Sequence, residues 1–503
     1  MKLILAASAV LAGYLGWRSL GWPLIHDAPL MHYVAWLIGQ GAVPYRDVFD
    51  MNLPGVYALH LAVLRTLGAG DAAWRALDLA WLGATALVLA AYCRGAAGPV
   101  AGVGAALLFA LYHLAGGAWR AGQRDFLLCV LLLAGAYGVA RSWEGAGALS
   151  PLVWGGAALG VAVTVKPQAG LLVLGWAAVA AAARRRAGRS ALGGAAAWLG
   201  AAAAAPALAV AWLAWRGGLG PFLDVLGGYV LPLYGGVGRA AWWQAIGWHR
   251  YGGLLLGGLA ALAALGLWRA RRGAGAARTW IGVSGAAYGA AHFLVQGKGW
   301  EYHLYPLGLF LCLLAGLALA PDAPRPASTG RATRGRSPLP IGPLSARAAA
   351  AVLLVATVTV LGAKGVDAVD APWIADKHRT VAALSADLAA VAPPGAAVQV
   401  MDTTAGGIHA LLRLGRREPT RFIYDFHFFH DEGDPRIQAL RREFATALAA
   451  APPAAVVVMR DTWPARGYDR LARFPEVADL LARRYALARE GDGYSIYARR
   501  EGA

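Results

Sequence analysis

The chain has 503 residues, a mean hydropathy of +0.49 and only 15% charged residues. A water-soluble protein of this length needs a larger charged surface, so the composition excludes that class. The formal net charge of +18 does not indicate nucleic acid, because the arginines gather in short segments between apolar runs and form no basic face with stacking aromatics. We therefore expect a polytopic α-helical membrane protein that contacts the lipid bilayer and binds no nucleic acid.

Apolar runs of bilayer length predict about eleven transmembrane helices. They cover about residues 3–21, 73–93, 98–115, 125–140, 152–165, 169–183, 191–215, 252–268, 279–295, 304–320 and 348–363. The first is expected to be a retained span, because no clear small-residue signal cleavage site follows it. Arginine-rich segments favour the cytoplasmic side, which puts the N-terminus there. The predicted domains are a transmembrane domain over 1–364, with a basic cytoplasmic loop at 321–347, and a soluble domain over 365–503.

Residues 54–68 are apolar but short, and they contain His60 and Arg65. If this segment crossed the bilayer, every later basic loop would fall on the outer side. We therefore predict an interfacial helix here, within an outer loop that covers residues 22–72.

The sequence of residues 365–503 predicts a small α/β domain on the periplasmic side. Residues 396–402 and 454–461 have the pattern of buried strands, and 485–500 that of two strands around a turn. A helix is expected over 436–450.

The predicted outer loops carry acidic, basic and aromatic residues at the membrane edge. These are Asp27, Arg46, Asp47, Asp50, Arg124, Asp125, Lys166, Lys298, Glu301, Tyr302 and His303. A polyprenyl-phosphate-linked sugar holds its phosphate at the same depth. Transfer of that sugar needs a carboxylate to take the acceptor's proton and cations to stabilise the departing phosphate.

Four segments of the chain resemble a known family. The first has an Asp after the first span, followed by "GQGAVPYRDVFDMNLPGVYALHLAVLRTLG" and then by Trp74–Arg75. The other three are "QRDFLLCVLLLAGAY", "VTVKPQAGLLVL" and "WEYHLYPLGLFLCLLAG". Their order and spacing over residues 1–320 resemble the GT-C glycosyltransferases. The chain is most similar to the group of protein O-mannosyltransferases and aminoarabinose transferases.

The resemblance implies inverting transfer of a hexosyl or pentosyl group from a polyprenyl-phosphate sugar, with Asp27 as the general base. Two positions depart from the family pattern. Ala28 stands where many relatives have a second acid, and "MNLPG" (51–55) stands where many have Lys-Pro-Pro or His-Pro-Pro. The resemblance therefore implies no second acid at position 28 and no basic contact within 51–55.

Each of these residues also has a structural interpretation. Asp27 and Asp125 could cap helices, and Arg124 could snorkel to the headgroups. Asp47 and Asp50 could shape a turn or pair with Arg46. Lys166 and the residues from Lys298 to His303 could anchor the ends of the spans.

The leading prediction is a bacterial glycosyltransferase of the cytoplasmic (inner) membrane that uses a lipid-linked sugar and a glycan, lipid or protein acceptor. The alternative is a transporter or flippase of a lipid-linked substrate, because Lys166–Pro167 is typical of a broken helix. The sequence identifies no cofactor, and it leaves open whether a divalent metal takes part. "FHFFHDEGD" (426–434) is a weak metal motif, and the three cysteines have no ligand spacing.

Overall fold

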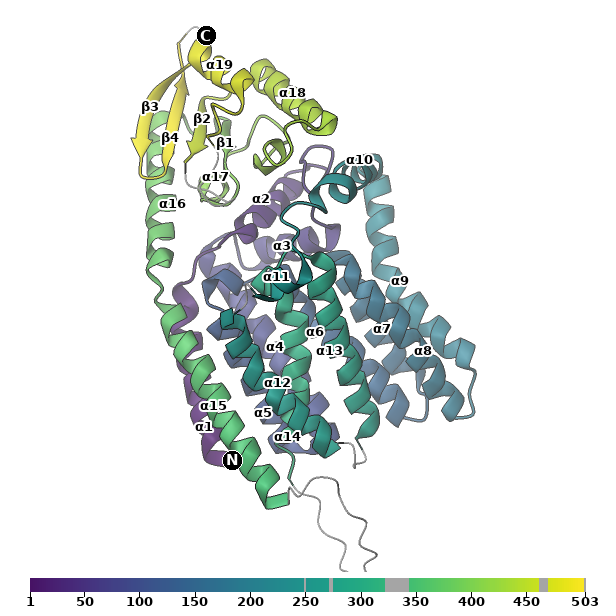
Figure 1. Cartoon of the computed structure of the whole chain (residues 1–503). Helices are drawn as coiled ribbons and strands as arrows, with labels where there is room; N and C mark the ends of the chain where they lie inside the picture. The colour runs from purple at the N-terminus through teal and green to yellow at the C-terminus, as the bar shows by residue number, and fades with distance from the viewer. Residues whose placement is uncertain (248–249, 271–274, 322–342, 461–468, 502–503) are drawn as a thin grey trace, which may run out of the picture.

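The computed structural model describes residues 1–247, 250–270, 275–321, 343–460 and 469–501. Each of the predicted spans falls on one helix of a bundle (Figure 1). These helices are α1 (Lys2–Arg18), α4 (Asp71–Ala97), α5 (Pro99–Ala115), α6 (Arg124–Glu144), α7 (Leu149–Val165), α8 (Gly170–Arg186), α9 (Ala191–Trp215), α12 (Arg250–Ala270), α13 (Ala276–Gln296), α14 (Tyr305–Ala318) and α15 (Pro343–Val369).

Among the described residues, six helical segments are long and apolar enough to cross a membrane by length and composition. Several others, including α5, α7 and most of α12, are shorter apolar helices. The predicted fold class, a helical membrane protein with a small C-terminal α/β part, is confirmed. Residues 322–342 of the predicted 321–347 loop lie outside the described residues.

Glycine and proline set where the helices turn and how closely they pack. Gly98 has a φ of 89° and ends α4, and Pro99 fits the first turn of α5. Helices α6 and α7 approach so closely that a Cβ on Gly138 would lie 2.9 Å from the Gly155 Cα. Small residues at such contacts let helix backbones meet within a membrane.

The two ends of the bundle separate the residues that the sequence assigns to opposite sides. At one end, Arg278 at the start of α13 donates from Nε to Glu144 Oε1 at the end of α6 (2.5 Å). Arg184 of α8 donates to the Gly147 carbonyl before α7 (2.9 Å), so α7 and α8 form a hairpin. At the opposite end lie the outer-loop residues, beneath the C-terminal domain (Figure 1).

Short elements connect the spans and cover that second end. They are η1 (Ser19–Gly21), α2 (Asp27–Gly39), α3 (Pro54–Thr66), η2 (Ala118–Arg120), η3 (Pro167–Ala169), α10 (Leu219–Val225), the π-helix η4 (Leu226–Tyr234), α11 (Trp242–Gly247) and η5 (Glu301–Leu304). Helix α3 coincides with the predicted interfacial helix and lies beside α2 over the bundle (Figure 1). His32 of α2 and His60 of α3 meet with their Nδ1 atoms 2.8 Å apart.

The C-terminal domain contains a four-stranded sheet in the order β1-β2-β4-β3. Its elements are α16 (Pro372–Val391), β1 (Val398–Met401), α17 (Gly407–Leu414), η6 (Phe426–Phe428), α18 (Pro435–Ala450), β2 (Ala455–Met459), α19 (Pro475–Arg484), β3 (Tyr485–Gly491) and β4 (Tyr494–Arg499). Strand β1 pairs in parallel with β2, and β4 pairs antiparallel with both β2 and β3. The predicted strands and the helix over 436–450 are confirmed.

The C-terminal domain rests on the outer loop 22–72 through specific polar contacts. Tyr33 donates its hydroxyl to the Arg416 carbonyl (3.0 Å) and accepts from the Glu418 amide (3.1 Å). Asp71 pairs with His409 (3.0 Å) and Arg413 (2.8 Å). These contacts hold the domain directly above the bundle.

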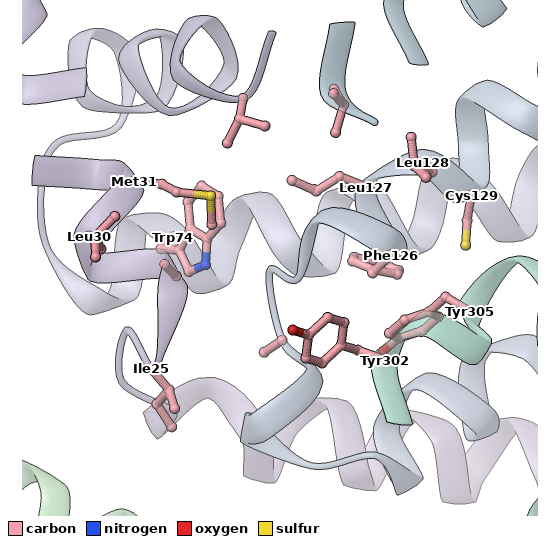
Figure 2. Packing of buried hydrophobic residues seen from close by; sticks show 14 of the residues in the cluster. Ile25, Leu30, Met31, Trp74, Phe126, Leu127, Leu128, Cys129, Tyr302 and Tyr305 are labelled. Carbon is pink, nitrogen blue, oxygen red and sulfur yellow. The ribbon is translucent and has the colours of Figure 1, made fainter. Parts of the chain in front are cut away.

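One apolar core runs from the spans into α2 and the C-terminal domain. Figure 2 shows part of it, with Met31 from α2, Trp74 from α4, and Phe126 from α6 near Tyr305. The Phe126 ring stacks on His113 at a centroid distance of 4.1 Å and lies 5.4 Å from the Tyr305 ring. Because α2 belongs to this core, its first residue, Asp27, has a defined position.

Candidate active site

A cavity of about 600 Å³ lies between the C-terminal domain and the end of the bundle beneath it. Its lining comes from loops at that end of the bundle and from the C-terminal domain. The lining residues include His26, Asp27, Met51, Asn52, Trp119, Gln123, Arg124, Tyr234, Trp300, Glu301, Tyr302, Thr403, Thr404, Tyr424 and Phe426.

Asp27 is the first residue of α2, and its side chain is 31% exposed in the cavity. His26, at the N-cap position, has a φ of 54°, and no side chain caps the helix. Capping therefore does not account for Asp27. Its Oδ2 lies 3.3 Å from Nη2 of Arg124. A carboxylate at a helix N-terminus interacts favourably with the helix dipole, and here it also contacts a guanidinium.

Arg124 is fixed by a chain of polar groups behind the cavity wall. Its Nη1 donates to the Asn52 side-chain oxygen. Asn52 in turn donates from Nδ2 to both carboxylate oxygens of Asp50, at 3.2 and 2.9 Å. Asp50 is only 1% exposed and does not line the cavity.

The loop that leads into α6 is anchored by buried charges in the spans. Asp78 of α4 accepts from the Gly122 amide (2.6 Å), pairs with Arg75 and lies 3.0 Å from His113 Nε2. Gly122 has a φ of 70°, a conformation that favours glycine. These contacts set where α6 begins and so where Arg124 points.

Asp125 and Lys166 form a buried ion pair just behind Arg124. Lys166 Nζ lies 2.6 Å from Asp125 Oδ2, and His292 Nε2 lies 2.6 Å from Oδ1. Lys166 also donates to Gln296 Oε1 (2.9 Å). Both charged side chains are buried, so neither is a helix cap or an anchor that reaches the headgroups.

Lys298 is a buried cation, and it has no carboxylate partner in the part of the chain that the structure describes. Its Nζ donates to the Tyr234 carbonyl (3.2 Å) and lies 3.4 Å from the centroid of the Tyr234 ring, which lines the cavity. Burial, together with the positive charges of Arg124 and Lys166, lowers the pKa of Lys298 to about 7. Its ammonium is therefore an available partner for an anion.

The segment after Lys298 forms one wall of the cavity. Glu301 faces the cavity and pairs with the buried Arg120. Tyr302 also lines it, and Lys166 Nζ lies 5.9 Å from the centre of the Tyr302 ring. His303 is buried, with its ring 4.7 Å from the Tyr302 ring, and does not reach the cavity.

Arg46 and Asp47 lie away from the cavity. They form an exposed ion pair at 2.8 Å, and Asp47 Oδ2 also accepts from the Val43 amide (2.8 Å). This is the turn-forming arrangement that the sequence left open. Four of the predicted site residues line the cavity: Asp27, Arg124, Glu301 and Tyr302. Five others lie one layer behind its surface: Asp50, Asp125, Lys166, Lys298 and His303.

Several residues of the site were not predicted from the sequence. Asn52, Arg120, Asp78, His292 and Tyr424 all belong to it or support it. Arg120 was visible as a charged residue in the external segment 116–125. Asp78 and His292 lie inside apolar spans, where an ionisable residue signals function. Tyr424 is far away in sequence and gave no signal.

The described residues contain no group of three or more His, Cys, Asp or Glu side chains placed to hold a metal ion. In the weak metal motif, His427 Nδ1 lies 2.8 Å from the Tyr229 hydroxyl. His427 thus has a structural partner at the contact between the soluble domain and η4.

No protein-family model matches the chain. No curated protein matches it in sequence either. Solved structures match in fold. ArnT from Cupriavidus metallidurans bound to undecaprenyl phosphate superposes with a TM-score of 0.62 at 13% identity, over 100% of this chain and 98% of that one. The apo state of the same protein superposes with a TM-score of 0.61 at 13% identity, over 99% of this chain and 97% of that one.

The oligosaccharyltransferase of Archaeoglobus fulgidus tethered to an acceptor peptide gives a TM-score of 0.50 at 14% identity, over 99% of this chain and 74% of that one. Both relatives in structure are GT-C glycosyltransferases. The predicted GT-C fold is therefore confirmed over the whole chain.

Proposed function

We propose that the protein is a membrane glycosyltransferase that moves a sugar from a polyprenyl-phosphate-linked donor to an acceptor hydroxyl, with inversion and with Asp27 as general base. The observation that carries this proposal is a partly exposed carboxylate, Asp27, beside cationic side chains at one cavity. Arg124 lies next to Asp27, and the buried Lys166 and Lys298 lie one layer behind the cavity surface.

The cationic side chains of Arg124, Lys166 and Lys298 suit the negative charge of a phosphodiester. The donor's phosphate lies at the membrane edge because its polyprenyl chain stays in the bilayer. The same kind of lipid, undecaprenyl phosphate, is bound by ArnT, whose fold this chain shares. Arg124 stands beside Asn52, where many relatives have a basic residue, and we propose that it takes over the contact to phosphate.

In the proposed step, the acceptor oxygen attacks the anomeric carbon of the sugar as its hydroxyl proton passes to Asp27. The bond from that carbon to the phosphate oxygen breaks, and the phosphate leaves with the electron pair. Arg124, Lys166 and Lys298 stabilise the charge that grows on it. A phosphate needs no general acid, since its second pKa is about 6, so one base and a cationic clamp are enough. Attack opposite the leaving group inverts the sugar configuration.

We further propose that the cavity opens on the outer face of the cytoplasmic membrane, with the N-terminus inside and the C-terminal domain outside. The positive-inside rule supports this orientation, because the bundle end opposite the cavity carries Arg94, Arg141, Arg184 and Arg278. The sugar and the acceptor, whether glycan, lipid or protein, are for experiment to identify.

The test is sugar transfer in membranes, with a panel of polyprenyl-phosphate sugars and the native protein, Asp27→Asn and Asp47→Asn. Loss of a general base costs about 10²- to 10⁴-fold in rate, so we expect Asp27→Asn to lose turnover while it still binds donor. Asp47→Asn is the matched control from the same outer loop, outside the cavity. Equal rates in native protein and Asp27→Asn would reject Asp27 as the base.

The same panel of donors also distinguishes a transferase from the alternative, a transporter of a lipid-linked substrate. The Lys166–Pro167 break is the turn of the α7–α8 hairpin, not an interruption within one span. No transfer with any donor, together with movement of lipid-linked sugar across the membrane that tolerates Asp27→Asn, would favour transport.

A further inference from the structure

Five side chains form a continuous hydrogen-bonded path from the C-terminal domain to the candidate base. Tyr424 donates its hydroxyl to Asp50 Oδ1 (2.8 Å). Asp50 accepts from Asn52, Asn52 accepts from Arg124, and Arg124 pairs with Asp27. Tyr424 and Asp50, the first two residues of the path, are 374 positions apart in the sequence.

Asp50 is saturated by donors from its surroundings. Besides Tyr424 and Asn52, the Tyr57 hydroxyl donates to Oδ2 (2.5 Å) and the Met51 amide donates to Oδ1 (2.8 Å). A carboxylate so buried and so fully bonded has little capacity left for a substrate. Its contacts instead fix its own orientation and that of its donors.

Asp50 determines which way the Asn52 amide points. The NH₂ group is the end of the amide that faces Asp50, where it can donate to the carboxylate oxygens. Asn52 Nδ2 contacts both oxygens of Asp50, which turns the Asn52 oxygen toward Arg124. A guanidinium donates only, so a flipped amide would repel it. The orientation of Arg124 therefore depends on the Asp50 carboxylate.

The C-terminal domain contributes the contacts that hold Asp50 from above. Tyr424 comes from this domain, and the Phe49 amide next to Asp50 donates to the Arg421 carbonyl (2.8 Å). Without the docked domain, Asp50 would lack this hydroxyl donor and its backbone would lack the neighbouring anchor.

We propose that Asp50 is a positioning residue that couples the docked C-terminal domain to the Asp27–Arg124 pair, so that the site is complete only when the domain is seated. This inference rests on the proposed transferase function for its kinetic consequence. The structural coupling itself can be measured without activity.

The test uses the full-length protein with Tyr424→Phe, Asp50→Asn and the matched control Tyr33→Phe. Tyr33 also joins the bundle to the domain through its hydroxyl, but it takes no part in the path to Arg124. Two quantities are measured: kcat and donor affinity in the transfer assay, and the rate at which phenylglyoxal labels Arg124, read by mass spectrometry of its peptide.

We expect Tyr424→Phe and Asp50→Asn to lower kcat by about 10- to 100-fold, because small misplacements of catalytic groups have effects of this size. Arg124 is 16% exposed in the native protein, so its labelling should accelerate several-fold in both variants. Tyr33→Phe should change neither quantity, because Asp71 still pairs with His409 and Arg413 and keeps the domain seated. Because Tyr424 also lines the cavity, Tyr424→Phe is repeated in the Asp50→Asn background, where no further loss of kcat is expected.

Equal kcat and equal Arg124 labelling in Tyr424→Phe and Tyr33→Phe would overturn the coupling. Additive effects of Tyr424→Phe and Asp50→Asn would overturn it as well, since Tyr424 would then act on substrate directly. If the native protein transfers no sugar, the proposed function fails, and the labelling rates alone decide whether Asp50 positions Arg124.

Discussion

Arg124 and Lys298 hold their charges near the cavity in different ways. The Arg124 guanidinium stays charged at any physiological pH, and it is oriented by both Asp27 and Asn52. Lys298 is oriented by the carbonyl and ring of Tyr234 and by the Trp300 ring, whose centroid is 5.1 Å from Nζ. Its pKa falls to about 7 because of burial and the nearby charges of Arg124 and Lys166. A phosphate that binds here should raise the pKa of Lys298 again, because its negative charge favours the protonated amine.

This difference predicts a pH dependence of donor binding. The Lys298 charge is present below its lowered pKa and is lost as pH rises through about 7. The dissociation constant of a polyprenyl phosphodiester should therefore rise with pH, by at most about tenfold per unit. A fluorescence titration from about pH 6 to about pH 9 measures this, since the single charge of a phosphodiester does not change in that range.

Lys298→Arg is the matched variant, because it keeps the charge at every pH in the titration. Its dissociation constant should stay flat through about pH 7 and rise only near pH 8, where Lys166 loses its charge because burial lowers the pKa of Lys166 to about 8. A native protein with the same profile as Lys298→Arg would remove Lys298 from the phosphate site.

At the scale of single elements, the loop after β1 shows how the soluble domain forms a rigid edge of the cavity. The Asp402 carboxylate accepts from the amides of Ala405 (2.8 Å), Gly406 (3.0 Å) and Gly407 (2.8 Å). Asp402 thus satisfies the amides that α17 leaves unpaired at its start. The loop cannot use those amides for a substrate, and it presents Thr403 and Thr404 to the cavity instead.

A buried ion pair supports this loop from below. Asp425 accepts from the Thr403 hydroxyl (3.1 Å) and from Arg470, and both charged side chains are almost wholly buried. Arg470→Leu would leave Asp425 charged and unpaired, which costs about 3–5 kcal/mol. We expect a lower midpoint of thermal unfolding of the full-length protein in detergent, followed by circular dichroism.

Arg379→Gln serves as the comparison, because it breaks an exposed pair with Asp376 on α16. Exposed pairs contribute little, so its midpoint should stay close to that of the native protein. Equal midpoints for Arg470→Leu and the native protein would show that the buried pair does not stabilise the domain.

At the scale of the whole molecule, the bundle separates two chemically different ends. One end has arginines that pair with backbone carbonyls or with Glu144, and the other has the cavity and the soluble domain. This polarity predicts opposite accessibility of the two ends in intact cells. Cys93, Cys129 and Cys312 are all buried, so introduced cysteines can be labelled against a low background.

Ala389→Cys on α16 should react with a membrane-impermeant maleimide in intact cells, and Arg189→Cys after α8 should not. Both positions are exposed in the structure. Permeabilised cells provide the control, since both variants should then react. Labelling of Arg189→Cys alone in intact cells would reverse the proposed orientation.

The sequence by itself determined the helices at the predicted spans, the helix within 54–68 and the strands of the C-terminal domain. Hydropathy and residue periodicity depend on local composition, so each predicted span falls on a helix and β1 to β4 lie where they were expected. The sequence also singled out Asp27, Arg124 and the segment from Lys298 to Tyr302, because charged residues at the ends of apolar runs can be recognised without a structure, and these residues lie at or directly behind the cavity.

Only the tertiary structure decided the roles of the acidic residues in "YRDVFD". Asp47 and Asp50 are three residues apart and alike in type, yet one forms an exposed pair with Arg46 and the other is buried under Tyr424. The difference comes from burial by the C-terminal domain, whose Tyr424 lies 374 positions after Asp50 in the chain. Hydrogen bonds such as Asp50–Tyr424 and Asp78–Gly122 depend on packing between distant segments, and no local pattern in the sequence encodes them.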